Sequence, residues 1–115
     1  MKFSVSDNDK FKVINIEGDL LINKRYEEIN KAVLKLIKEG YHHFVFNLEK
    51  LSLIDSSGIS VFINCLCDVQ ENNGSIFLII PDPSVREVIE LVGLNRLIKT
   101  YNSEKEFEKE HIQKE

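Results

Sequence analysis

The chain has 115 residues, of which 43% are hydrophobic and 30% are charged, and its formal net charge is −4. This length suits one small domain with a single core, expected over residues 1–115, and the negative charge argues against nucleic acid as a partner. The apolar runs are too short to span a membrane, and the N-terminus lacks the apolar block of a signal peptide, so we expect a cytoplasmic protein.

The first forty residues predict a β-hairpin followed by an amphipathic helix. Apolar and polar residues alternate in FSVSDND and FKVINIEGD, with Phe11 and Val13 expected to point inward and residues 7–9 expected to form the turn. From residue 23 to about 39 the apolar positions recur at helical spacing, and Gly40 is expected to end that helix.

The next segments alternate strands with helices. Dense β-branched and aromatic residues predict a buried strand at about 44–48, and SIFLII predicts a central parallel strand. Between these strands a helical stripe begins at Ile59 and ends at the turn signal of residues 72–74. PDPSVREVIELVGL predicts a third helix with a capping box of Ser84 and Glu87, and RLIKTY predicts an edge strand.

The last segment, residues 103–115, predicts a mostly charged helix that opens with a capping box of Ser103 and Glu106. Phe107 and Ile112 are its few apolar residues, so we expect this tail to pack weakly. The full order, ββαβαβαβα, predicts a single α/β domain in which amphipathic helices pack a mixed, mostly parallel sheet with an N-terminal hairpin.

The segment LSLIDSSGISVF places two adjacent serines where a strand ends and a helix begins. Open α/β folds usually bind their ligands at this edge of the sheet. A serine-hydrolase elbow needs glycines two residues before and after the nucleophile, and a phosphate-binding loop needs clustered glycines, yet the glycines here are isolated. Neither motif is present. A simpler alternative is that Asp55 or one of the serines only caps the helix.

A helical wheel separates the two serines. The apolar stripe of this helix consists of Ile59, Phe62, Ile63, Leu66 and Val69. The stripe centres opposite Ser57, so we expect Ser57 to face solvent, whereas Ser56 points toward the flank of the stripe. Val61, Asn64 and Asp68 share the side of Ser57. This side fits either a partner-binding surface or an ordinary solvated face.

Two residue pairs could suggest metal or redox chemistry. Cys65 and Cys67 lie two residues apart on a helix, so their side chains point to different faces and are expected to be packed structural thiols. His42 and His43 diverge on a strand and have no further ligands at metal-binding spacing. We therefore expect no metal, no cofactor and no catalytic residues.

The segments VFNL at 45–48 and IDSSGI at 54–59 together resemble the signature of STAS domains, in particular of the bacterial anti-sigma factor antagonists. The segments IEGDL, NNGSIFLII and VREVIELVGLNRLIKTYNSEKE extend this resemblance over nearly the whole chain.

The resemblance implies a regulator that is not an enzyme. In that family the unphosphorylated domain binds an anti-sigma factor that is also a serine protein kinase, and this binding frees a sigma factor. The kinase phosphorylates the second serine of the motif, here Ser57, and a serine phosphatase restores it. Around Ser57, the expected motif and partner-binding residues are Asp55, Ser56, Gly58, Val61, Asn64 and Asp68.

Leu21 is a departure, since family members often have an aspartate at this position. It is compatible with a second hypothesis, a STAS-like binding or scaffold module that regulates a signalling complex or a transporter without being phosphorylated. A third hypothesis, a small hydrolase that uses Ser57, lacks any Ser-His-Asp pattern. The partly apolar helices are also compatible with a homodimer.

Overall fold

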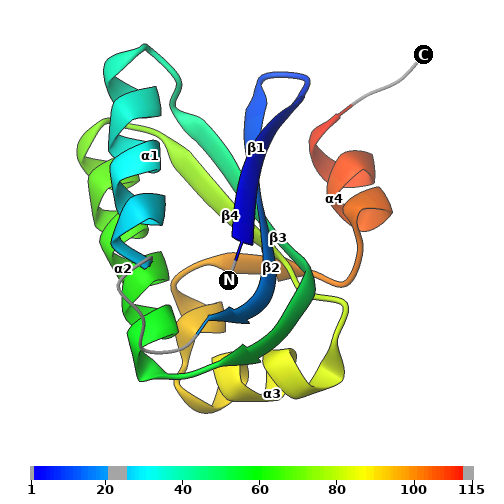
Figure 1. The fold of residues 1–115 in the computed structure, drawn as a ribbon. Coiled ribbons are helices and arrows are strands. Elements are labelled where there is room, and N and C mark those ends of the chain that lie inside the picture. The colour runs from blue at the N-terminus through cyan, green and yellow to red at the C-terminus, as the bar shows by residue number, and fades with distance from the viewer. Residues whose placement is uncertain (1, 21–25, 113–115) are drawn as a thin grey trace.

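The computed structural model describes residues 2–20 and 26–112 (Figure 1). Its elements, in chain order, are β1 (Lys2–Asn8), β2 (Phe11–Leu20), α1 (Tyr26–Lys38), β3 (His43–Ile54), α2 (Ser56–Glu71), β4 (Ser75–Ile79), α3 (Pro83–Leu91), the 3-10 helix η1 (Leu94–Arg96), β5 (Lys99–Tyr101) and α4 (Glu104–His111). The predicted order ββαβαβαβα is therefore confirmed.

The five strands form one sheet in the order β1-β2-β3-β4-β5. β1 pairs antiparallel with β2, and every later neighbour pairs in parallel. The hairpin turns at Asp9 and Lys10, where Asp9 takes a φ of 56°, a backbone region that Asp and Asn tolerate better than most residues. The predicted mixed, mostly parallel sheet with an N-terminal hairpin is confirmed.

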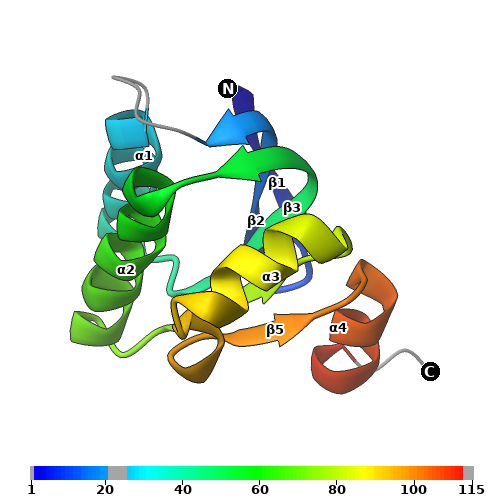
Figure 2. The ribbon, with the colours of Figure 1, turned by 90° about the horizontal axis from the view of Figure 1, so that it is seen from below.

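The sheet has a core on each face. α1, α2 and α3 contribute to the larger core, whereas α4 packs on the opposite face, as Figures 1 and 2 show from two directions. Side chains along β3 alternate between the two cores, with Phe44 and Phe46 in the larger one and Val45 in the smaller one. Because both faces are covered in the first half of β3, Phe44, Val45 and Phe46 are apolar in succession.

α3 begins earlier than the sequence suggests. Its N-cap is Asp82, whose carboxylate accepts a hydrogen bond from the backbone N–H of Ser84 at 2.7 Å. Pro83 occupies the first turn, where its fixed φ suits the helix and its missing N–H leaves no donor unpaired. The predicted capping box of Ser84 and Glu87 is therefore wrong, because Ser84 already lies inside the helix.

α4 packs more tightly than its composition suggests. Ser103 caps the helix as predicted, since its hydroxyl accepts a hydrogen bond from the backbone N–H of Glu106. Phe107 is buried, with ring centroids 4.9 Å from Phe11 and 5.4 Å from Tyr101. The expectation of a weakly packed tail is therefore wrong for the residues up to His111. One aromatic ring inserts into an existing ring cluster, a histidine stacks on it, and these contacts anchor a helix of few apolar residues.

Candidate functional site

The serine motif lies at the junction of β3 and α2, at the carboxyl end of β3. Asp55 leaves the strand with an extended backbone and serves as the N-cap of α2. One of its carboxylate oxygens, Oδ1, accepts hydrogen bonds from the backbone N–H groups of Ser57 at 3.0 Å and Gly58 at 3.2 Å. The capping role considered for Asp55 is thus confirmed, and both serines occupy the first turn of the helix.

The two serines differ in exposure, but in the reverse of the expected order. Ser56 is exposed, whereas Ser57 is half-buried at the border of the packed side of α2. The backbone carbonyl of Ser56 also accepts a hydrogen bond from the Ser60 hydroxyl at 3.0 Å, which adds to the order of this first turn. Gly58 is buried. Ser57 therefore lies at an edge of the packed side of α2, while the Ser56 side chain is exposed to solvent.

The reason is that the packed side of α2 is rotated from the predicted stripe. Its buried residues are Gly58, Ile59, Val61, Phe62, Cys65, Leu66 and Val69. Ile63, which the stripe included, is 38% exposed, and Val61, which the stripe excluded, is fully buried. α1 covers this side of α2, since the Cys65 thiol donates a hydrogen bond to Oδ1 of Asn30 on α1.

The burial of Val61 corrects one predicted site residue. A side chain with no exposed surface cannot contact a partner, so its assignment to the partner-binding surface is wrong. Asn64 is exposed and Asp68 is half-buried, and together with Ser57 they form one strip along α2 within about 40° of each other on the helical wheel. We call these three residues the serine strip.

Leu53 is an exposed apolar residue near the serine motif that the sequence did not reveal as a candidate for partner binding. It lies two residues before Asp55 and is 54% exposed, although it stands in an apolar run. The pairing of β2 with β3 shifts register between Gly18 and Asp19, next to the position where Leu53 pairs. Such an irregularity changes which side chains point outward, and the apolar pattern alone does not reveal it.

The cysteines and histidines do not build a reactive centre with the motif. Burial, with a smaller contribution from the negative charge of Asp68, raises the pKa of the Cys65 thiol to about 12. Cys67 is exposed, so the expectation of a packed thiol is correct for Cys65 and wrong for Cys67. Among the described residues, no group of three His, Cys, Asp or Glu side chains could hold a metal ion.

The histidines lie elsewhere in the fold. His43 begins β3, the strand whose other end carries the motif, and its Nδ1 pairs with the hydroxyl of Ser75 at 2.8 Å. His111 pairs with the Tyr101 hydroxyl on the α4 face of the sheet. Their positions give Ser57 no histidine partner of the kind that a serine hydrolase requires.

Two further points bear on the predictions. Leu21, the departure from the family pattern, lies outside the described residues. Within the part of the chain that the structure describes, none of the helices has both the length and the apolar character needed to cross a membrane.

Comparisons with known proteins agree with this architecture. The family model described as STAS domain matches residues 2–107. A Thermotoga maritima protein, provisionally named as an anti-sigma factor antagonist, is 26% identical over 99 residues, which cover 81% of this chain and 88% of that protein. The anti-sigma-B factor antagonist of Staphylococcus aureus is 21% identical over 98 residues, which cover 85% of this chain and 90% of that protein.

A solved structure is similar over nearly the full length. The Bacillus cell fate determinant SpoIIAA in its phosphorylated form superposes with a TM-score of 0.72 at 23% identity, covering 96% of this chain and 100% of that one. At this level of identity the likeness establishes the fold.

Proposed function

Since this chain belongs to the STAS domain family, we propose that it is an anti-sigma factor antagonist that acts by partner switching in the cytoplasm. In this proposal the unphosphorylated protein binds an anti-sigma factor that is also a serine protein kinase, and a sigma factor is released. Phosphorylation of Ser57 abolishes that binding, and a serine phosphatase reverses it. The protein itself catalyses no reaction.

The observation that carries the proposal is the position of Ser57 in the first turn of α2, directly after the Asp55 cap. The names of the relatives support the antagonist role, and the phosphorylated state of the similar SpoIIAA structure supports a phosphorylation step. Asn64 and Asp68 of the serine strip extend from Ser57 along α2 and offer polar groups to a partner.

The position also suggests how a phosphate would act. A phosphoserine carries about −1.5 to −2 charges at pH 7. Ser57 is half-buried at the positive end of a helix dipole, where an anion is stabilised by up to about 2 kcal/mol, so α2 should keep its structure. The added charge and bulk, next to the carboxylate of Asp55, would instead oppose a partner at this surface.

The first experiment measures binding of the candidate kinases of the source organism by calorimetry, using wild type, Ser57→Ala and Ser57→Asp. We expect Ser57→Ala to bind like wild type and Ser57→Asp to bind more than about tenfold more weakly, because like charges within an interface cost several kcal/mol. Ser56→Asp adds the same charge one residue away on the solvent side, so a smaller loss of affinity in this variant would show that the effect depends on the position of Ser57. Equal affinities of Ser57→Asp and wild type would refute the switch.

The second experiment locates the phosphate. Incubation with ATP and each kinase, followed by mass spectrometry of the motif peptide, should give one phosphate on Ser57 and none in Ser57→Ala. A phosphate on Ser56 would overturn the assignment of the acceptor. A chain that retains its partners in pull-downs regardless of Ser57→Asp, and accepts no phosphate, would instead be the scaffold module.

A further inference from the structure

A polar groove crosses the sheet face that carries α4. Two cavities of about 410 and 600 Å³ adjoin there, and Asn47 and Glu49 of β3 line both of them. The smaller cavity extends toward β1 and β2, and the larger one extends toward the start of α4. We call the two together the β3 groove. It lies on the opposite face of the sheet from α2, so it is separate from the serine motif.

The floor of the groove holds a buried amide. Asn47 is only 9% exposed, and its Oδ1 accepts a hydrogen bond from the backbone N–H of Glu49 at 3.0 Å. Among the described residues, no acceptor pairs with its Nδ2. Within the part of the chain that the structure describes, the one fully buried polar side-chain atom without a partner is Nδ1 of His42, so Nδ2 of Asn47 is accessible at the groove surface. The amide N–H of Asn47 therefore offers a donor to a molecule in the groove.

The polar floor continues across the neighbouring strands. Asn15 on β2 is the register partner of Asn47, and Ser4 on β1 is the register partner of Asn15. The Asn15 amide nitrogen donates to the hydroxyl of Ser6 at 3.0 Å, which fixes the orientation of this side chain. Amide groups in a row across a sheet present both donors and acceptors, the pattern that a peptide backbone can satisfy.

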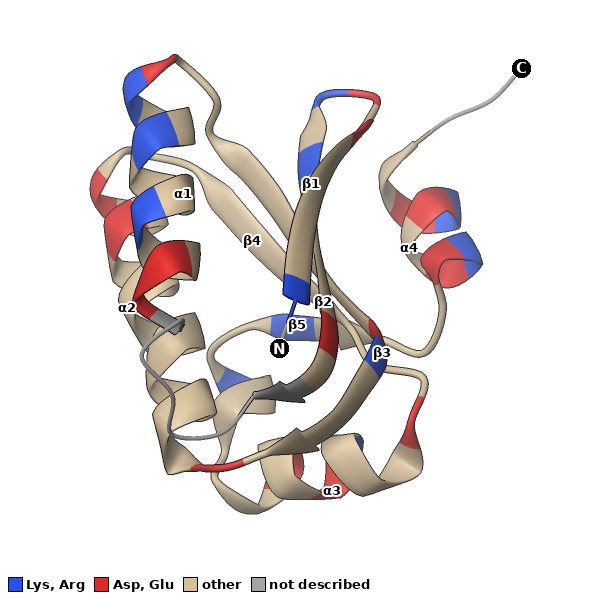
Figure 3. Cartoon of the chain, in the orientation of Figure 1, with Lys and Arg blue, Asp and Glu red and all other residues tan. Residues whose placement is uncertain are grey.

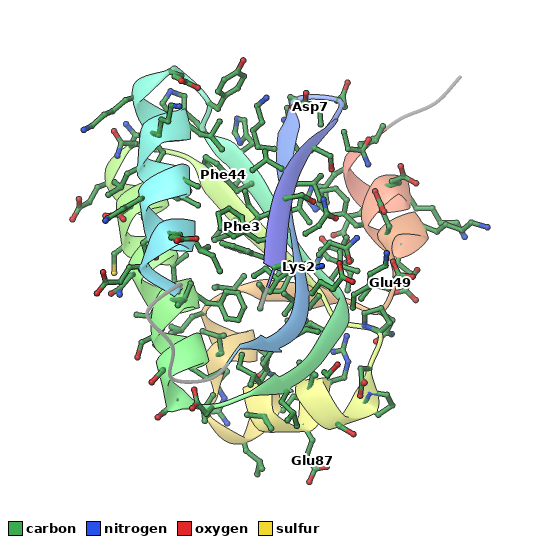
Figure 4. The ribbon with its side chains drawn as sticks, in the orientation of Figure 1. Lys2, Phe3, Asp7, Phe44, Glu49 and Glu87 are labelled. Atoms are coloured by element: carbon green, nitrogen blue, oxygen red, sulfur yellow. The ribbon has the colours of Figure 1, made fainter. Side chains whose placement is uncertain are left out.

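The two ends of the groove differ in charge, because the β1 end has as many lysines as glutamates when Glu49 is counted, whereas the α4 end is negative. Apart from the shared Glu49, the end at β1 has two lysines, Lys2 and Lys50, and one glutamate. The end at α4 has two glutamates, Glu104 and Glu108, and one lysine. Figure 3 shows the charged residues of α4 and of β3, and in Figure 4 the side chain of Glu49 lies toward α4 while Lys2 lies at the start of β1.

We propose that the β3 groove binds an extended peptide segment whose amino or basic end lies against Glu104 and Glu108 and whose acidic end lies against Lys2 and Lys50. The groove is lined from β1 to β4, three strand spacings of about 4.8 Å, and an extended peptide rises about 3.3 Å per residue. A segment of about four residues therefore spans it. The proposal is independent of the proposed function, because it uses no residue of the serine motif.

Other polar ligands fit the charge pattern less well. A polyamine finds no net negative charge at the end with Lys2 and Lys50, and a multivalent anion would be repelled by Glu104 and Glu108. A peptide with charge of one sign at each end complements both.

The test uses the full chain labelled with ¹⁵N and the tetrapeptide Arg-Ala-Ala-Glu with free termini. We expect saturable shifts of the side-chain amide signals of Asn15 and Asn47 in NMR titrations. The reversed peptide Glu-Ala-Ala-Arg has the same composition, but each of its ends carries both signs of charge. We therefore expect its affinity to be lower by about fivefold or more. Spermidine and citrate serve as the polyamine and anion probes.

Two groups of variants locate the binding. The double variant Glu104→Gln with Glu108→Gln keeps acceptors for the Asn8 amide, which both carboxylates now contact, and should weaken Arg-Ala-Ala-Glu about fivefold. Asn47→Asp keeps the acceptor for Glu49 N–H and removes the Nδ2 donor, so it should also weaken binding. The matched control, Glu87→Gln with Glu90→Gln, makes the same charge change on the exposed side of α3, where Glu87 points away from the domain (Figure 4), and should leave binding unchanged.

The proposal is overturned if Arg-Ala-Ala-Glu causes no saturable shifts, if the reversed peptide or spermidine binds as tightly, or if the control variant weakens binding as much as the α4 variant. Ser57→Asp should leave peptide binding unchanged. Loss of kinase binding with retained peptide binding, or the reverse, would therefore separate the fate of this proposal from that of the proposed function.

Discussion

At the residue scale, the carboxylate of Asp55 controls the geometry of the motif. Its Oδ1 accepts hydrogen bonds from two backbone N–H groups that would otherwise be unpaired at the start of α2. Asp55→Ala should lower the free energy of unfolding by about 1 to 2 kcal/mol, measured by urea denaturation. Asp55→Asn keeps the acceptor oxygen and should lose less. A loss as large for Asn as for Ala would contradict the capping role, and Asp68→Ala, which removes no cap, serves as the control.

The orientation of α2 shows what residue patterns can and cannot predict. The sequence located the helix and its first turn correctly, because the apolar period and the Asp-Ser-Ser-Gly junction are local signals. It could not reveal that α1 covers the side of Val61 and Cys65, because that contact depends on tertiary packing. As a result the predicted stripe is rotated from the packed side, although Ile59, Phe62, Leu66 and Val69 are buried as expected, and the exposures of Ser56 and Ser57 are the reverse of the prediction.

The burial of Cys65 predicts that the free energy of unfolding depends on pH. Burial raises the pKa of its thiol from an ordinary value of 9.0 to about 12 in the folded chain. Between these values the unfolded chain loses this proton while the folded chain keeps it, so the free energy of unfolding should fall as pH rises above about 9. The slope from this thiol is at most about 1.4 kcal/mol per pH unit.

The measurement is urea unfolding under reducing conditions at several pH values from 8 to about 10, with Cys65→Ala as the reference. Because other groups also titrate in this range, the difference between the two proteins isolates the thiol. Cys67→Ala is the matched control and should keep the wild-type slope, since Cys67 is exposed. Equal slopes for wild type and Cys65→Ala would show that the Cys65 thiol does not cause this pH dependence.

At the element scale, α4 depends on one inserted ring. Phe107 packs edge-to-face on Phe11 and Tyr101, and His111 stacks on it from the last turn. Phe107→Ala should lower the free energy of unfolding by about 3 to 4 kcal/mol, because it removes a buried aromatic side chain and leaves a cavity. Lys109→Ala, an exposed change on the same helix, should stay within about 0.5 kcal/mol of wild type.

Hydrogen exchange can distinguish loss of the ring from loss of the whole helix. If Phe107 anchors α4, the amides of α4 should lose more protection than those of α1 in Phe107→Ala, whereas Lys109→Ala should change neither set. Unchanged protection of α4 would show that other contacts hold it, such as the hydrogen bonds from Asn8 to Glu104 and Glu108.

The same helix shows why element order is easier to predict than packing. The apolar residues of a strand recur with a period of two and those of a helix with a period of 3.6. The changes between these periods along the sequence predict the order ββαβαβαβα. The ring cluster under α4 joins Phe11, Phe77 and Phe107, which are far apart in the sequence. The β3 groove is similar, because Asn15 and Asn47 become neighbours only through the register of β2 and β3.

At the scale of the whole molecule, the two cores share one sheet. β2, β3 and β4 contribute side chains to both the larger core and the smaller core under α4. Loss of packing on one face should therefore weaken the strands that support the other face. This arrangement predicts that the chain unfolds as one cooperative unit, consistent with the expectation of one domain over residues 1–115.

Differential scanning calorimetry tests this prediction. A single transition is expected, with equal calorimetric and van't Hoff enthalpies of roughly 80 kcal/mol for a chain of this size. Phe107→Ala in the smaller core and Ile29→Ala in the larger core should each shift that single transition to lower temperature without splitting it. Both residues are nearly fully buried, so the two variants perturb the two faces in a comparable way. Two resolved transitions in either variant would mean that the faces unfold separately, and then a partner bound at the serine strip and a peptide in the β3 groove would stabilise different units.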